Sequence, residues 1–268
     1  MSEGPIGYER LCEIADGLIE GWHSYLDREP VSKSIDLVRV GCLYGLAMNN
    51  TKLLEFIAKS YREEASPLIL MPLVRTSYET GITAQWIAQV RDAPNAWINE
   101  SRRQSAGLVR ILRGSNNETF RSAADPVEKA RVAYADLPDP ASARTVAASF
   151  KEICDEVGVG ADGSYQYYKL LCAFTHPSVD LADQYIAQDQ TNPPTSLVAL
   201  REPKFDATDA WLFLAVVATV WAQMAFQYRA QDRVLRNSLR IVSRELGIVL
   251  DLKLTEKAWL RQNQPKSS

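Results

Sequence analysis

The sequence predicts an all-α fold, a single-domain multi-helix bundle of roughly eight helices over residues 1–261, followed by a frayed C-terminal tail at 262–268. Apolar residues recur at three- and four-residue steps through most of the chain, which is the spacing of one buried face of a helix. Convincing stretches of alternating apolar and polar residues, typical of half-buried strands, do not occur in it. With 268 residues, the chain can also bury a core without disulfide or metal support.

Each expected helix is bounded by residues that start or stop helices. Ser34 can cap one helix, Pro67 suits the first turn of the next, and Gly114 stops the one after that. The proline-rich residues 137–140 form a connector, and the prolines within 189–205 predict a loop. The expected helices are 8–26, 34–63, 66–90, 96–112, a short one from residue 125, 141–157, 164–175, 206–228 and an arginine-rich one ending at residue 245.

Composition and charge restrict the class of protein. The 30 Lys and Arg residues against 33 Asp and Glu residues give a net charge of −3, which argues against a strongly cationic nucleic-acid coat. Four cysteines far apart, and an N-terminus without a leader pattern, predict a cytoplasmic protein. The apolar stretch 211–228 is nearly long enough to span a membrane, but Thr219, Gln223 and Gln227 interrupt it, so we expect a buried core helix.

The scarcity of histidine argues against most metal-dependent chemistry. Only His23 and His176 occur, and Glu20–His23 is the one Glu-x-x-His unit where a di-iron bundle needs two. His23 is therefore expected at the surface of its helix. Phosphate-binding, dinucleotide-binding and nucleophile-elbow motifs are absent from the sequence. No cofactor and no metal is predicted.

A charged pair stands on an otherwise apolar helix. Arg75 and Glu79 lie four residues apart, and the positions around them in 66–90 are apolar on nearly every face. Burying one charge alone costs several kcal/mol, so each group needs partners. The pair is either a structural ion pair that orients two helices or part of the lining of a polar pocket.

A second polar cluster lies at residues 165–178. Tyr165, Tyr168, Cys172, Thr175 and His176 fall near one face of the expected helix. Cys172 and His176 have the spacing of a thiolate–imidazolium nucleophile, but no third group that would orient them is identifiable, and a small buried cysteine is the commoner case. His176 stands at the helix end before a proline, where it is available for proton transfer or for a hydrogen bond to a carboxylate.

Together the two clusters resemble a bacterial all-helical family of unknown function. Its pattern is R-x-x-x-E on an early apolar helix and H-x-S at the end of a later Tyr/Lys-rich helix. The matching residues are Arg75, Glu79, His176 and Ser178, within about 53–181, and Cys172 stands where the family usually has Ser.

Proteins of this kind are also distantly similar to the HEPN superfamily, many of whose members are ribonucleases in toxin and phage-defence systems. That superfamily places an Arg before a His, with four to six residues between them, at a dimer interface. Here the nearest basic residue before His176 is Lys169. Lysine can bring charge to a phosphate, but it lacks the planar two-pronged contact of arginine.

Two charged stripes lie at the ends of the chain. One is acidic and consists of Glu9, Glu13, Asp16, Glu20 and Asp27. The other is basic and consists of Arg229, Arg233, Arg236, Arg240 and Arg244. At about 100° per residue, each stripe occupies one arc opposite the apolar face of its helix. The stripes are solvated faces, contacts to nucleic acid, or the two halves of a protomer interface, and we predict a homodimer in which they meet.

Two functional hypotheses follow. The first is an intracellular stress- or phage-defence-associated protein in which Arg75, Glu79, His176 and Lys169 form a HEPN-like RNA-cleaving or nucleotide-binding site. The second is a non-enzymatic interaction or regulatory module whose polar core residues only hold the bundle together. The arrangement in space separates them, because the first requires Arg75, Glu79 and His176 to converge on a site that solvent reaches.

Overall fold

The computed structural model describes residues 6–28, 36–133, 137–158, 164–188, 196–230 and 234–263. Helices dominate these residues, so the predicted all-α class is confirmed. The helices are α1 (Tyr8–Leu26), α2 (Leu37–Arg62), α3 (Pro67–Gln89), α4 (Ala93–Arg113), α5 (Glu118–Ser122), α6 (Ala124–Val132), α7 (Ala141–Ala147), α8 (Phe150–Glu156), α9 (Ser164–Thr175), α10 (Val179–Asp183), α11 (Thr208–Arg229), α12 (Arg236–Glu245) and α13 (Glu256–Asn263). Short strands pair antiparallel, β1 (Val157–Gly158) with β4 (Lys253–Leu254) and β2 (Ile186–Gln188) with β3 (Leu197–Ala199).

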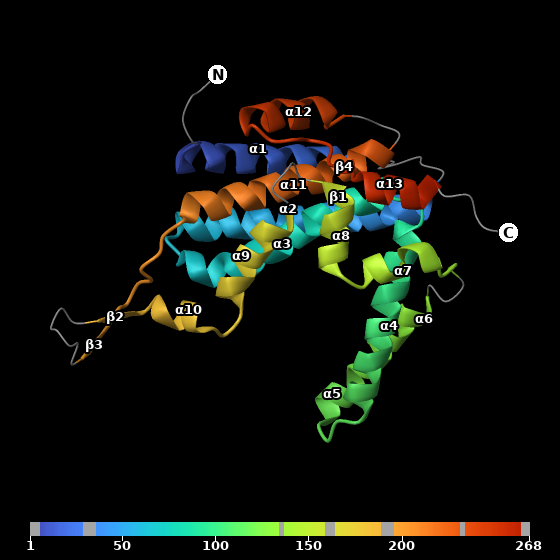
Figure 1. Ribbon diagram of the computed structural model, residues 1–268, viewed down its shortest axis with the longest axis horizontal. Coiled ribbons are helices and arrows are strands. Elements are labelled where there is room, and N and C mark those ends of the chain that lie inside the picture. The colour runs from blue at the N-terminus through green and yellow to red at the C-terminus, as the bar shows by residue number, and fades with distance from the viewer. Residues whose placement is uncertain are drawn as a thin grey trace.

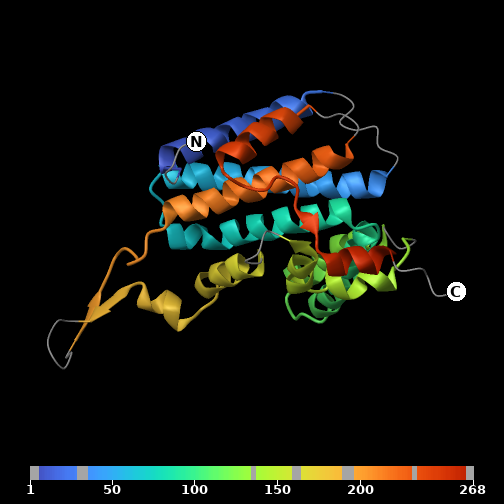
Figure 2. The same ribbon diagram turned by 45° about the horizontal axis from the view of Figure 1, so that its top comes forward.

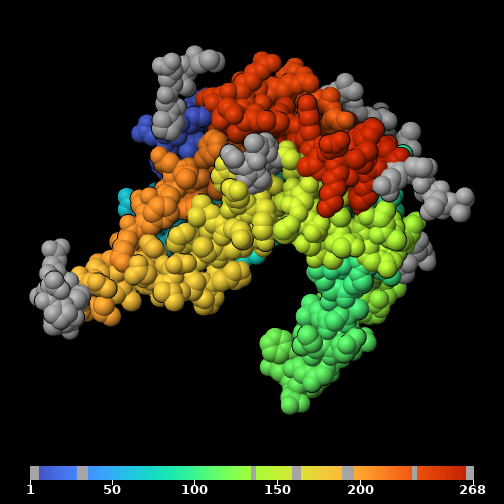
Figure 3. Space-filling view, viewed as in Figure 1, coloured from blue at the N-terminus to red at the C-terminus, as the bar shows by residue number. Residues whose placement is uncertain are grey.

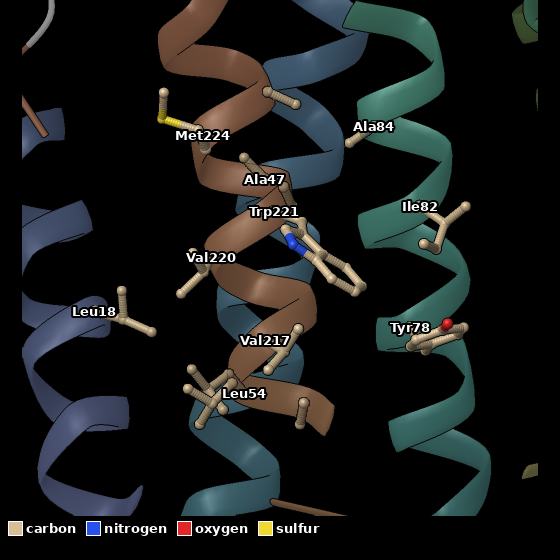
Figure 4. Packing of buried hydrophobic residues seen from close by; sticks show 14 of the residues in the cluster. Leu18, Ala47, Leu54, Tyr78, Ile82, Ala84, Val217, Val220, Trp221 and Met224 are labelled. Atoms are coloured by element: carbon tan, nitrogen blue, oxygen red, sulfur yellow. The ribbon is translucent and has the colours of Figure 1, made fainter. Parts of the chain in front are cut away.

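The long helices α1, α2, α3 and α11 lie side by side and form the body of the molecule (Figures 1 and 2). α11 is the central helix and packs against α3, α2 and α1. Figure 4 shows part of this core, in which Tyr78 and Ile82 of α3 lie beside Val217 and Trp221 of α11. The rings of Tyr78 and Trp221 meet edge to face, with their centroids 6.2 Å apart. The most apolar helix is thus enclosed by the others.

The polar residues that interrupt α11 make hydrogen bonds inside the core. Thr219 Oγ1 donates to a backbone carbonyl one turn earlier, at 2.9 Å, and Gln223 Nε2 donates to Thr51 Oγ1 at 3.1 Å. Gln227 Oε1 accepts from the backbone N–H of Leu235 at 3.2 Å. Among the described residues, α11 is the one helix long and apolar enough to cross a membrane, and 78% of its most apolar window is buried by the rest of the chain. It occupies the place of a core helix, as the sequence predicts.

Two arginines hold the C-terminal end of α3. The guanidinium of Arg39 is buried and donates to the carbonyl of Val90 at 2.8 Å and to the carboxylate of Asp36 at 2.8 Å. Arg229, at the end of α11, donates to the carbonyl of Ala88 at 2.6 Å. The last carbonyls of a helix lack partners within it and carry partial negative charge, so cations are favoured there. Burial, with the nearby Arg39, lowers the pKa of Arg229.

The helices outnumber the eight expected, partly because one predicted segment is divided. The segment 141–157 breaks at Ser149, whose backbone is extended and whose side chain accepts a hydrogen bond from the N–H of Glu152. Serine favours such a capping position over a helix interior, which explains why α7 and α8 are separate. The predicted loop at 189–205 carries β3, whose residues pair with β2 to form a hairpin.

Two predicted boundaries shift by a few residues: the start of α2 and the start of the C-terminal tail. Ser34 lies outside the described residues, and α2 is capped instead by Asp36, which accepts from the N–H of Arg39. At the C-terminus, residues 262 and 263, expected in the tail, belong to α13. The side chain of Asn263 donates to the carbonyl of Trp259 at 2.8 Å and so prolongs the helix.

The helices α4, α5 and α6 form an arm that projects from the body (Figure 1). α4 begins next to the end of α3 and packs mainly against α6 and α7. The molecular outline is hollowed between this arm and α9–α10 (Figure 3). The arm exposes the large apolar side chains of Leu108, Ile111 and Phe120. It therefore leaves apolar surface outside the core of the body.

Gly81 sets the close approach of α3 and α11. A Cβ atom at this position would lie 2.6 Å from the carbonyl oxygen of Ala218, closer than real Cβ atoms come to their neighbours. We predict that Gly81→Ala lowers the free energy of unfolding by about 1–3 kcal/mol, because the two helices must move apart. Denaturant unfolding followed by circular dichroism measures this loss.

Gly17 of α1 provides the matched control for Gly81. A Cβ atom at Gly17 meets nothing within 4 Å. Gly17→Ala should therefore stabilise its helix by roughly 0.5–1 kcal/mol. Equal unfolding midpoints for the two variants would contradict the close α3–α11 packing.

Candidate functional site

The candidate site lies where α9 packs against the first half of α3. The hydroxyl of Tyr78 on α3 donates to the carbonyl of Ser164 at 2.8 Å and fixes the start of α9. Phe150 of α8 packs against Tyr168 of α9, with ring centroids 4.7 Å apart. α9 ends just before His176-Pro177, since a proline disfavours the helical conformation of the residue before it. These contacts bring the end of α9 to Arg75.

Arg75 is the centre of the site. Its Nε donates to Glu79 Oε1 at 2.9 Å, the contact expected for a four-residue spacing on a helix. Its Nη2 donates to the hydroxyl of Tyr168 at 2.8 Å, and its Cζ lies 5.0 Å from the centroid of that ring. Its Nη1 donates to Thr175 Oγ1 at 3.1 Å and lies 3.0 Å from His176 Nε2. The structure thus brings the predicted Arg75, Glu79 and His176 together.

The contact between Arg75 and His176 determines the state of the imidazole. A guanidinium stays protonated and can only donate hydrogen bonds, so His176 Nε2 must be the acceptor. The imidazole is then neutral, with its proton on Nδ1. While this contact lasts, the Nε2 lone pair is occupied. An anion that draws Arg75 away would free it to act as a base.

The positive charge of Arg75 is balanced by Glu79, and solvent reaches both side chains. Burial opposes the charge of Arg75, but the hydrogen bond and the charge of Glu79 prevail and raise the pKa of Arg75. Burial, a hydrogen bond with Cys172 and the charge of Glu79 raise the pKa of Tyr168 to about 12, so the phenol stays protonated. The side chains of Arg75 and Glu79 are 22% and 34% exposed, and His176 is exposed. The cluster therefore lies at the surface and is not sealed in the core.

Lys169 lies beside this network. Its Nζ lies 5.9 Å from the centroid of the Tyr165 ring, and Nζ of Lys151 on α8 lies 5.9 Å from the same centroid. The Tyr165 ring in turn contacts Tyr168, with centroids 5.6 Å apart. Aromatic rings beside positive charges suit the bases and phosphates of a single nucleic-acid strand. Lys151 could not be identified from the sequence, because it stands on a different helix and no local pattern connects it with Tyr165.

Ser178 has a local structural role, and Cys172 is not paired with His176. Ser178 Oγ accepts from the N–H of Leu181 at 3.1 Å and donates to the carbonyl of Ala173 at 2.9 Å, so it caps α10 and joins it to α9. In the described part of the chain, no hydrogen bond joins Cys172 to His176, whose Nε2 meets Arg75 instead. The thiolate–imidazolium pair considered from the sequence is not formed.

The described residues form no candidate metal centre. No group of three or more His, Cys, Asp or Glu side chains in this part of the chain is placed to hold a metal ion. His23 lies at the surface of α1, as expected, with its Nε2 3.9 Å from Glu55 Oε2. That the protein works without metal or cofactor stays a prediction.

The basic stripe differs from its expected form. α11 ends at Arg229, Ala230 is extended, and α12 begins only at Arg236, so the arginines do not share one helix. Arg229 is directed to a carbonyl at the end of α3, and Arg233 lies outside the described residues. The guanidinium of Arg236 lies 5.8 Å from the ring centroid of Tyr228. The continuous 3.6-residue pattern that suggests one stripe cannot reveal a break between two helices.

The remaining arginines lie on the outer helices. Arg240 and Arg244 are exposed on α12, which lies beside α1 (Figure 1). Between these helices, Arg10 Nη2 of α1 donates to Glu245 Oε2 of α12 at 2.9 Å. The hydrogen bond from Arg10 lowers the pKa of Glu245. The acidic stripe of α1 and the two arginines of α12 therefore lie on neighbouring helices of one protomer.

The chain is an all-helical protein in which an arginine and a carboxylate of α3 meet a histidine at the end of α9 on the surface. Residues 60–193, half of the chain, match DUF5677, a family of unknown function. The chain therefore belongs to the DUF5677 family. Comparison with curated proteins and with solved structures gives no match.

The matched segment has a clear place in the fold. It contains all residues of the Arg75 network and the whole arm, whereas α1, α11 and α12 lie outside it. The predicted resemblance to a family of unknown function is confirmed at that level. The match names neither the HEPN superfamily nor an organism, so the similarity to HEPN proteins and the bacterial origin stay predictions.

The hydrogen bond to Arg75 predicts one tautomer of His176. Long-range proton–nitrogen NMR spectra should show an Nδ1-protonated, neutral imidazole, and Arg75→Lys should shift these signals because the contact is lost. His23, the other histidine, should be unaffected by that substitution, since it lies on α1. An Nε2-protonated His176 in the unaltered protein would contradict the contact.

The acidic stripe of α1 and the exposed Arg240 and Arg244 of α12 predict salt-dependent self-association. At low salt, sedimentation velocity should detect a dimer that dissociates as salt screens the charges. Reversing Arg240 and Arg244 to Glu should weaken the dimer. Reversing Glu9 and Glu20 to Lys in the same chain should restore it, because opposite charges face each other again. A monomer at low salt would exclude this arrangement.

Proposed function

We propose that this protein binds RNA at the Arg75 site and cleaves its backbone, with His176 as the general base. The observation that carries the proposal is the 3.0 Å contact between Arg75 Nη1 and His176 Nε2 at a place that solvent reaches. RNA cleavage needs a cation at the phosphate and a base beside it, and this pair supplies both. Glu79 and Tyr168 support the proposal, because they hold Arg75 from two other sides.

In this mechanism the substrate itself makes the base available. A phosphodiester anion accepts a stronger hydrogen bond than a neutral imidazole, so it draws Nη1 of Arg75 away from His176. His176 Nε2 then takes the proton of the neighbouring 2′-hydroxyl. The 2′-oxygen bonds to phosphorus, the bond from phosphorus to the 5′-oxygen breaks, and the 5′-oxygen takes a proton from water. The products are a 2′,3′-cyclic phosphate and a free 5′-hydroxyl.

The aromatic and basic residues beside the site extend the contact to neighbouring nucleotides. Tyr165 offers a ring on which a base can stack, and Lys151 and Lys169 place positive charge next to it. Lys169 then binds a phosphate and is not a catalytic residue. An RNA substrate and four free cysteines fit a cytoplasmic location.

The second candidate is a non-enzymatic interaction module in which Arg75 only fastens α9 to α3. Hydrogen bonds within the chain engage Nε, Nη1 and Nη2 of Arg75, as they would in a structural role. In that case the exposed apolar side chains of the arm are the surface for a partner.

Incubation with end-labelled single-stranded RNA separates the two candidates. The protein should yield fragments with cyclic phosphate ends. His176→Ala should slow cleavage by roughly 100–10,000-fold, the usual contribution of a general base. Tyr165→Leu should raise KM and leave kcat nearly unchanged, because it removes stacking and not chemistry.

His23→Ala is the control, because His23 is the other histidine and lies at the surface of α1. This variant should cleave like the unaltered protein. A 2′-deoxy strand should bind without being cut, since it lacks the attacking hydroxyl. If the unaltered protein neither binds nor cuts RNA, the interaction module is the better account.

A further inference from the structure

A long apolar groove lies between α2 and the arm, away from the Arg75 site. Its cavity volume is 680 Å³. Its α2 wall runs from Leu37 to Asn49, which is about 18 Å at the helical rise per residue. Trp97 and Ile98 of α4 form the facing wall, and α6 closes one side through Ala130.

Small residues create this groove. Gly41 and Gly45 lie one turn apart on the α2 wall, and Ser101 and Ser105 lie one turn apart on α4. A Cβ atom at either glycine would meet nothing within 4 Å, so these glycines leave open space and do not serve a close helix contact. Burial raises the pKa of the Cys42 thiol in the same wall to about 11, so this side chain stays uncharged.

Two arginines reach the groove, and they differ in their partners. Arg131 donates two hydrogen bonds to the carboxylate of Glu128, at 2.8 and 2.6 Å. Arg102 donates to the carbonyl of Arg131 at 3.1 Å and to Asn99 Oδ1 at 2.8 Å, and both acceptors are neutral. Among the described residues no carboxylate forms an ion pair with Arg102, which is half-buried. A half-buried cation without a counter-charge favours an anionic ligand.

We infer that this groove binds a linear fatty acid, with the acyl chain along Gly41 and Gly45 of α2 and the carboxylate on Arg102. The cavity volume falls in the range of small-molecule sites, roughly 300–1,000 Å³. The elongated apolar walls fit a flexible chain, and the planar guanidinium fits a carboxylate. Arg75 and His176 do not line the groove, so this inference is independent of RNA cleavage.

The probe for this site is 11-(dansylamino)undecanoic acid. Excitation of tryptophan should give energy transfer to the bound dansyl group, because Trp97 lines the groove. Trp97→Phe should reduce the transfer while direct excitation of the dansyl group still reports binding. The absence of saturable binding to the unaltered protein would overturn the inference.

Filling the groove tests the position of the chain. Gly45→Leu should weaken probe binding at least about tenfold, since its side chain occupies the space of the acyl chain. Gly107→Leu is the matched control: it also lies inside a helix with nothing within 4 Å of its Cβ, but it does not line the groove. Leucine favours helix more than glycine, so both variants should fold. Equal binding by the two variants would place the probe elsewhere and overturn the inference.

Arg102→Gln tests the carboxylate. This variant should bind the dansyl acid about tenfold more weakly, while competition by uncharged dodecanol should be unchanged. Lys129→Gln, which removes an exposed charge of the same arm, should alter neither. If Arg102→Gln and Lys129→Gln bind the acid equally well, the assignment of the carboxylate to Arg102 is wrong.

Discussion

The burial of α3 dictates how the helices around it are placed and which partners they provide. From Ser77 to Ala88, every side chain of this helix except Glu79 is buried. Its polar groups therefore need partners from the elements around it: Trp86 Nε1 donates to Glu156 Oε2 at 2.7 Å, and Arg39 and Arg229 donate to the carbonyls of Ile87 and Ala88 near its end. The same requirement explains the site. Arg75 and Glu79 belong to the part of α3 that α9 covers incompletely, and there the hydrogen-bond partners of the charged pair remain open to solvent.

Much of the fold could be predicted because its long helices carry clear apolar periodicity and strong end signals. Residues 8–26 and 164–175 form the helices expected from them, and α3 begins at the expected proline. The break at Ser149 was not predicted, since helix-compatible residues continue across it. A boundary between the apolar helix and the arginine-rich helix was expected, but not that Arg229 belongs to α11 and that α12 begins only at Arg236. A repeating pattern shows which face of a helix is apolar, but it does not show at which residue the helix ends and a capping residue starts the next one.

The candidate site was partly predictable for a related reason. A charged pair on an apolar helix must find partners, and a histidine at a helix end before proline is a natural one, so Arg75, Glu79 and His176 could be named in advance. Their meeting depends on the packing of α9 against α3, which no local pattern encodes. The proposed roles of Lys151 and of the groove beside Arg102 depend equally on helices distant in the chain. Both sites use the segment shared with the DUF5677 family, but the groove also needs α2 residues before it.

In the proposed mechanism, a phosphate displaces Arg75 from His176 and so frees the base. An NMR titration with a 2′-deoxy oligonucleotide, which can bind but cannot be cleaved, tests this step directly. We expect the Nε2 signal of His176 to shift on saturation, and Arg75→Lys to abolish this response. Saturable binding that leaves the His176 signals unchanged would exclude the displacement of Arg75, because the contact between Arg75 and His176 would then be structural.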